Sequence, residues 1–138
     1  MSANYIYYNY ATSQVCTVKE ERSSYICSRS VEHYFDELCI LHGSTLEGRK
    51  KAFSKLMEQK NFIPVVVQVH PHEIYFPIKP MKDPQNIWIC YEEIESIEQK
   101  NKTCVIHFKD QTCLECEHPQ RIKNQMHQIF RFLKRKDI

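Results

Sequence analysis

Two glycines, Gly43 and Gly48, are the only ones in this chain of 138 residues, and both lie within one six-residue segment. Glycine is the usual residue where the backbone must adopt a left-handed or crowded conformation. The sequence therefore singles out residues 43–48 as a segment of special backbone conformation between two elements. The patterns on either side of this segment decide what those elements are.

Three segments carry apolar residues at the spacing of amphipathic helices. The first covers residues 31–41, begins after Ser30 as its N-cap and stops at Gly43. The second covers residues 46–59, with Ser44 or Thr45 as its cap. The third begins at Pro119 and runs to the C-terminus. Its apolar stripe consists of Ile122, Met126, Ile129, Phe130 and Leu133.

The remaining segments are typical of strands, because they are short and rich in β-branched and aromatic residues. Residues 5–28 predict two or three strands. Residues 63–69 and 73–78 predict a hairpin, and residues 103–108 and 112–116 predict a second hairpin. Residues 87–91 form a further strand, which Ile94 and Ile97 either continue or follow as a short turn. Trp88 in this strand is expected to pack in the core.

These elements predict one α+β domain over residues 1–138. We expect an antiparallel β-sheet or partial barrel packed against the C-terminal amphipathic helix, with a helical pair near residues 31–59 on it as well. No run approaches eighteen apolar residues, and residues 1–10 lack the basic start and apolar stretch of a signal peptide. We therefore expect a cytoplasmic protein without a membrane partner.

The charge is unevenly distributed although its net value is only +2. Residues 43–82 carry seven basic and three acidic side chains, and residues 118–138 carry six basic and one acidic. The segments before and between them are acidic. If the two basic segments fold onto one face, they form a surface that binds a polyanion. The alternative is a solvated surface of mixed charge.

Seven cysteines and seven histidines invite metal or thiol chemistry. Cys104 precedes His107, and Cys113 precedes Cys116, at a zinc-like spacing. Residues three apart in a strand point to opposite faces, so neither pair should chelate. The segment His70-Pro71-His72 is typical of a turn. We expect reduced thiols that mostly pack in the core, and we predict no cofactor, no metal and no catalytic residue. A thiol or zinc enzyme remains an alternative class.

Residues 43–50, GSTLEGRK, match a phosphate-binding loop only superficially. Arg49 stands where that loop needs lysine, and Lys50 stands where a hydroxyl should hold magnesium. The segment also follows a predicted helix rather than a strand, so we exclude nucleotide hydrolysis. Backbone N–H groups and cations at a helix start still favour a phosphate, which DNA would supply. The alternative is a helix–helix corner with exposed lysines.

The same segment resembles the ComK family of competence transcription factors. From residue 39 the chain reads C-x3-G-S-T-x2-G-R-K, similar to the family's C-x3-G-S-S-x2-G-R-K, with Thr45 in place of a second serine. The likeness covers about residues 24–135. It continues, in order, with Pro64 in an apolar strand, an apolar-Phe-Pro strand at residues 74–77, a Trp-Ile element at residues 87–89, a Thr-x-apolar-x-Phe hairpin and the C-terminal helix.

The resemblance implies an activator of DNA-uptake genes in Gram-positive bacteria. It implies binding to A/T-rich boxes in double-stranded DNA, as homodimers or paired dimers that read the minor groove and bend the DNA. It further implies control by an adaptor–protease pair. The sequence patterns alone indicate two clustered basic segments and no catalytic motif.

We predict that both basic segments contact DNA. Arg49 is expected to enter a narrow A-tract minor groove, whose negative potential attracts arginine. The predicted phosphate contacts are Lys50, Lys51 and Lys55, helped by Ser44 and Thr45, together with Lys134, Arg135 and Lys136. The alternative is a PH-like or LytTR-like module, suggested by fold analogy, that binds a protein partner or an anionic lipid surface without enzymatic activity.

Overall fold

The computed structural model describes residues 2–80 and 82–136, except for the side chain of Lys136. Three α-helices and nine strands make up the described part. The helices are α1 (Val31–Leu41), α2 (Leu46–Met57) and α3 (Pro119–Lys136). The strands are β1 (Tyr5–Asn9), β2 (Gln14–Lys19), β3 (Arg22–Cys27), β4 (Val65–Gln68), β5 (Glu73–Pro77), β6 (Ile87–Cys90), β7 (Ile94–Gln99), β8 (Thr103–Phe108) and β9 (Cys113–Glu117).

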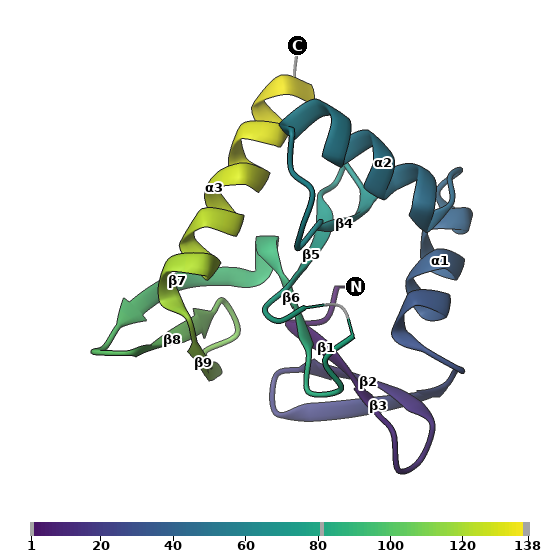
Figure 1. Ribbon diagram of the computed structural model, residues 1–138. Helices are drawn as coiled ribbons and strands as arrows, with labels where there is room; N and C mark the ends of the chain where they lie inside the picture. Colours follow the sequence, from purple (N-terminus) through teal and green to yellow (C-terminus); the bar gives the residue numbers. More distant parts are fainter. Residues whose placement is uncertain (1, 81, 137–138) are drawn as a thin grey trace.

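The strands form two antiparallel sheets rather than one (Figure 1). The larger sheet has the order β3-β2-β1-β6-β5-β4, and the smaller has the order β7-β8-β9. A short 3-10 turn, Tyr91–Glu93, leads from β6 into β7 and so from one sheet to the other. The Glu92 carboxylate holds this turn, because it accepts a hydrogen bond of 2.7 Å from the Ile74 N–H. Ile94 and Ile97 therefore belong to the second sheet.

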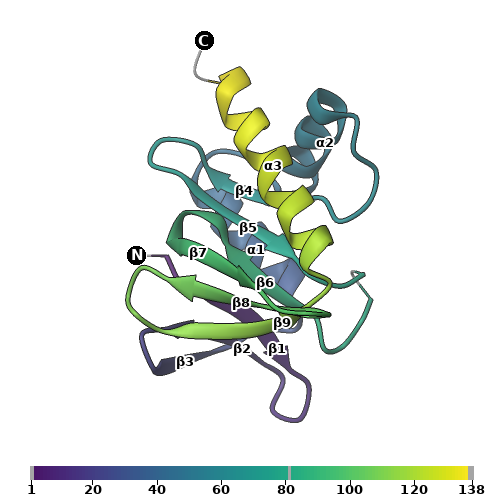
Figure 2. The same ribbon diagram turned by 90° about the vertical axis from the view of Figure 1, so that its left-hand side faces the viewer.

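Strands β4, β5 and β6 of the larger sheet bury alternate residues on both of its faces. On one face Val65 and Val67 pack in a cluster with residues of α1, and Trp88 lies 6.0 Å from Phe35 between ring centroids. On the other face Val66 packs in a cluster that includes Ile129 of α3. Figure 2 shows α3 lying across the sheets with α1 behind them. The expected α+β architecture and the core position of Trp88 are confirmed.

The helices begin close to where their capping residues predict. The Ser30 hydroxyl accepts a hydrogen bond of 3.0 Å from the His33 N–H at the start of α1. Helix α3 begins at Pro119, as predicted. Helix α2 ends at Met57, two residues before the predicted end, because Glu58 adopts a left-handed conformation with φ of 53°. None of the helices in residues 2–80 and 82–136 is long and apolar enough to cross a lipid bilayer.

Candidate nucleic-acid interface

The junction between α1 and α2, which we call the corner (residues 42–49), is built around its two glycines. Gly43 has φ of +90°, a left-handed conformation that glycine adopts without steric cost. Its N–H and that of Ser44 donate to carbonyls of the last turn of α1, at 3.0 and 3.2 Å. At Gly48 a Cβ atom would lie 3.1 Å from the hydroxyl oxygens of both Ser44 and Thr45. Gly43 therefore suits its left-handed backbone, and a side chain at Gly48 would crowd the two hydroxyl groups.

The start of α2 is capped from within the chain. The Thr45 hydroxyl accepts a hydrogen bond of 3.0 Å from the Gly48 N–H, and the Asp36 carboxylate accepts one of 2.9 Å from the Leu46 N–H. Thr45, rather than Ser44, is thus the N-cap. Because these two N–H groups already have acceptors, and one acceptor is negatively charged, the helix start is a weaker phosphate site than the sequence indicates.

Arg49 lies half-buried in the corner. Its Nη2 donates to the backbone carbonyl of His42 at 2.9 Å, so the guanidinium bridges the start of α2 and the end of α1. Its Nε is buried and lacks a hydrogen-bond partner among the described residues. Burial raises the pKa of the neighbouring Cys39 thiol to about 11, although the positive charge of Arg49 opposes that shift. The contact with His42 ties the arginine to the end of α1.

The three lysines of α2 have different surroundings. Lys50 is half-buried beside a surface cavity of about 420 Å³. Burial lowers the pKa of its ammonium group, and the carboxylates of Glu32 and Glu47 oppose that shift. Lys51, which lines the same cavity, and Lys55 are exposed. Long-range attraction and contact with a phosphate therefore favour Lys51 and Lys55 over Lys50.

The two basic segments come together in space. The ring centroids of Phe53 in α2 and Phe132 in α3 are 4.8 Å apart, and the Arg135 guanidinium donates to the Leu56 carbonyl. In both views the C-terminal ends of α2 and α3 meet at one end of the molecule, opposite β3 (Figures 1 and 2). Arg135 thus joins the helices. Lys134 is exposed, and its Nζ lies 5.3 Å from the Phe130 ring centroid.

The prediction for Lys136 lies outside the described residues, because the position of its side chain is not described. Arg131, which the sequence analysis does not select, is exposed on α3. The sequence contains a signal for it: residues 119–136 contain no Asp or Glu, so no carboxylate on the same helix neutralises this arginine. Lys60 and Arg135 are exposed here as well, and Arg135 joins the helices; we call four other exposed cations of α2 and α3 the outer ridge: Lys51, Lys55, Arg131 and Lys134.

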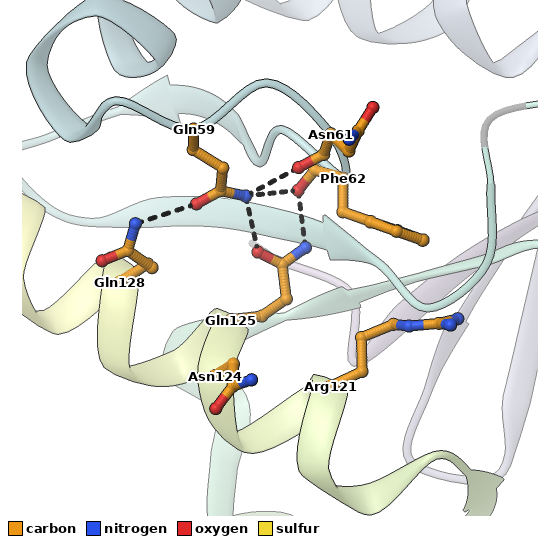
Figure 3. Close-up of a pocket in the computed structure, with 7 residues that line it drawn as sticks. All are labelled: Gln59, Asn61, Phe62, Arg121, Asn124, Gln125 and Gln128. Carbon is orange, nitrogen blue, oxygen red and sulfur yellow. Dashed lines mark hydrogen bonds between the residues drawn. The ribbon is translucent and has the colours of Figure 1, made fainter.

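A cluster of amide side chains fixes the angle between α3 and the segment after α2 (Figure 3). Gln59 donates to the carbonyls of Asn61 and Phe62, both at 3.0 Å. Gln125 is 4% exposed and donates to the same Phe62 carbonyl at 2.6 Å, while its oxygen accepts from Gln59 at 3.1 Å. Gln128 donates to the Gln59 oxygen at 3.2 Å. These residues line a pocket of about 430 Å³, but they satisfy one another, so we interpret the cluster as a joint that positions α3.

The cysteine and histidine pairs follow the geometry of strands. Cys104 lies opposite Cys116 on the buried face of the small sheet, and His107 lies opposite Cys113 on its other face. Burial raises the pKa of the Cys116 thiol to about 12. Within the described residues no group of three or more His, Cys, Asp or Glu side chains is arranged to hold a metal ion. Five of the seven cysteines are buried, as expected for small core residues.

Comparison with known proteins identifies a family. Residues 4–136 match the ComK protein family. No curated protein and no solved structure matches the chain. The match covers both basic segments and the corner between α1 and α2. The chain belongs to the ComK family, whose members are DNA-binding competence transcription factors and not enzymes.

Proposed function

We propose that this protein binds A/T-rich DNA boxes through the end of the molecule where α2 and α3 converge. The observation that supports this most is the convergence itself. Two cation-rich segments far apart in the sequence meet through Phe53, Phe132 and Arg135. Because α3 carries no carboxylate, the field at this end is positive despite the small net charge of the chain.

The proposed roles of the cations follow from how each is held. The outer ridge has long, exposed side chains that reach phosphate oxygens, so it supplies affinity that depends on salt and little on sequence. Arg49 is already oriented by the His42 carbonyl, so it loses little conformational entropy when it binds. A fixed arginine at the surface suits a narrow A-tract minor groove, whose potential attracts its charge.

The remaining parts of the proposal rest on the family. We expect homodimers or paired dimers on DNA, bending of the bound duplex, activation of DNA-uptake genes in a Gram-positive bacterium, and removal by an adaptor–protease pair in the cytoplasm.

Fluorescence anisotropy on two labelled duplexes tests the proposal. One duplex carries two A/T tracts about one helical turn apart, and the other is a G/C-rich scramble of equal length. We expect tighter binding to the A/T duplex and a steep dependence on salt for both. Equal binding to both duplexes would reduce the protein to a non-specific polyanion binder. Binding to anionic vesicles without any affinity for DNA would favour the lipid-binding alternative.

A further inference from the structure

Strand β3 forms an open edge of the six-stranded sheet. All six of its residues are exposed, including Tyr25 at 54% and Ile26 at 39%. It pairs with β2 without a bulge along its full length and contains neither proline nor, after Arg22, any charged residue. An edge strand of this kind is a template for pairing with another strand.

The other sheet edges in the described part of the chain are protected. At the opposite edge of the larger sheet, β4 is four residues long, has a register shift between Val66 and Gln68, and contacts both α1 and α2. In the small sheet, β7 exposes Glu95 and Glu98, and β9 carries carboxylates at residues 115 and 117. Short length, irregular register, cover and like charge all prevent edge pairing. Strand β3 uses none of these devices.

The backbone pattern determines which residues of β3 can pair outward. Residues 20 and 21 form the turn between β2 and β3, so Lys19 and Arg22 are the hydrogen-bonded pair that closes the hairpin. Alternate residues then direct their N–H and C=O groups away from β2, and these are Ser23, Tyr25 and Cys27. The Val18 carbonyl, opposite Ser23, accepts from the Asn4 N–H on the other side of β2, in agreement with this alternation.

We infer that β3 pairs antiparallel with β3 of a second copy of this chain, about a two-fold axis through Tyr25. The outward N–H and C=O groups of both copies form hydrogen bonds only in a register that places odd-numbered residues opposite odd-numbered residues. In the register centred on Tyr25, Ser23 lies opposite Cys27 of the second copy. Glu21, in the turn before the strand, and Arg29, in the bend after it, then lie near each other at both symmetry-related ends. This self-complementary charge favours a second copy over an unrelated strand.

This inference deepens the proposed homodimer by naming its interface, and its test involves no DNA. Strand β3 lies at the end of the molecule away from the meeting point of α2 and α3 (Figures 1 and 2). A pair joined at β3 therefore carries its two outer ridges at the far ends of one continuous sheet. Such an assembly suits two separated boxes on one duplex.

Site-directed cross-linking tests the register. In the S23C variant, the introduced thiol faces Cys27 of the second copy, with the two Cα atoms about 5.5 Å apart, a separation that a disulfide spans. We expect copper–phenanthroline oxidation of dilute S23C to give a covalent dimer on a non-reducing gel. The wild type and S24C are the controls. In the wild type Cys27 faces a serine of the second copy, which cannot form a disulfide. In S24C the introduced thiol points to the opposite face of the sheet.

A dimer band in S23C alone supports the interface. No band in S23C, or an equal band in both controls, overturns it. Sedimentation velocity gives an independent test of the same register. Glu21→Arg and Arg29→Glu should each weaken self-association about tenfold, since each change creates two like-charge contacts, and the double variant should restore it. A monomer at every concentration, or a dimer whose dissociation constant is the same in these variants, contradicts the inference.

Discussion

The corner and the outer ridge hold cations of the same kind in opposite ways. At the corner Arg49 is half-buried and donates to the His42 carbonyl, and directly after it Lys50 is partly withdrawn from water beside Glu32 and Glu47. On the outer ridge Lys51, Lys55 and the two α3 residues extend into solvent. At the corner part of the charge is engaged in a contact between two helices, whereas the charges of the outer ridge face solvent, where a ligand can contact them.

Because of this difference, the residues of the sequence motif are not the residues that we expect to contribute most of the affinity for DNA. The motif residues Gly43, Thr45, Gly48 and Arg49 each have a structural task at the helix junction. Their tight arrangement suits a rigid reader of groove shape, which contributes selectivity. On the outer ridge Arg131 donates to Gln128 at 2.9 Å and Lys134 lies over Phe130, but these contacts stay within α3 and at its exposed surface, so the outer ridge contributes affinity. Variants that remove one property and keep the other can therefore separate the two regions.

The largest effect is expected from charge reversal on the outer ridge. Lys51→Glu with Lys55→Glu should weaken binding to both duplexes about a hundredfold, or about 2.7 kcal/mol, because two attractive phosphate contacts become repulsive. Anisotropy at fixed salt measures the loss. Lys100→Glu with Lys102→Glu is the matched control, since these exposed lysines lie in the turn between β7 and β8. An equal loss in the control would show that only net charge matters.

The joint between the two regions should be next in effect. Gln125→Ala removes two hydrogen bonds of the joint, one to the Phe62 carbonyl and one from the Gln59 amide, so the free energy of unfolding should fall by about 2 kcal/mol. Urea unfolding followed by Trp88 fluorescence measures this change. Gln120→Ala, on the exposed side of α3, is the control and should change the free energy of unfolding little. An unchanged midpoint for Gln125→Ala would mean that the joint does not hold α3.

Arg49→Ala should change selectivity more than affinity for random DNA. We expect the preference for the A/T duplex to fall about tenfold, while binding to the G/C-rich duplex changes little. The free energy of unfolding should also fall by about 1 kcal/mol, because the His42 carbonyl loses a donor. Competition anisotropy well below the unfolding midpoint separates the two effects. Equal losses on both duplexes would assign Arg49 to phosphate contact.

The smallest effect is expected at a single phosphate contact. Lys134→Ala should weaken binding to both duplexes about threefold and reduce the salt slope by about one. Lys50→Ala should reduce the slope by less, since that ammonium group is half-buried. A larger slope change for Lys50 than for Lys134 would reverse the assignment of these two lysines.

The sequence predicts the elements well because their signals are local. Ser30, Gly43 and Pro119 mark helix boundaries through capping and backbone geometry alone. The division into two sheets depends instead on where the turn at residues 91–93 sends the chain, which pairing between distant strands decides. The orientation of Arg49 and the contact of Arg135 with Leu56 depend on tertiary packing, so no local pattern could reveal them.

The central claim is that the outer ridge supplies the salt-dependent affinity for DNA and the corner supplies selectivity. The most direct test measures the binding constant against salt concentration for the wild type, for Arg49→Ala, and for a variant with alanine at Lys51, Lys55, Arg131 and Lys134. The account predicts that the fourfold variant loses about three to four units of slope on both duplexes, and that Arg49→Ala keeps its slope on the G/C-rich duplex. A fourfold variant with the wild-type slope would contradict it.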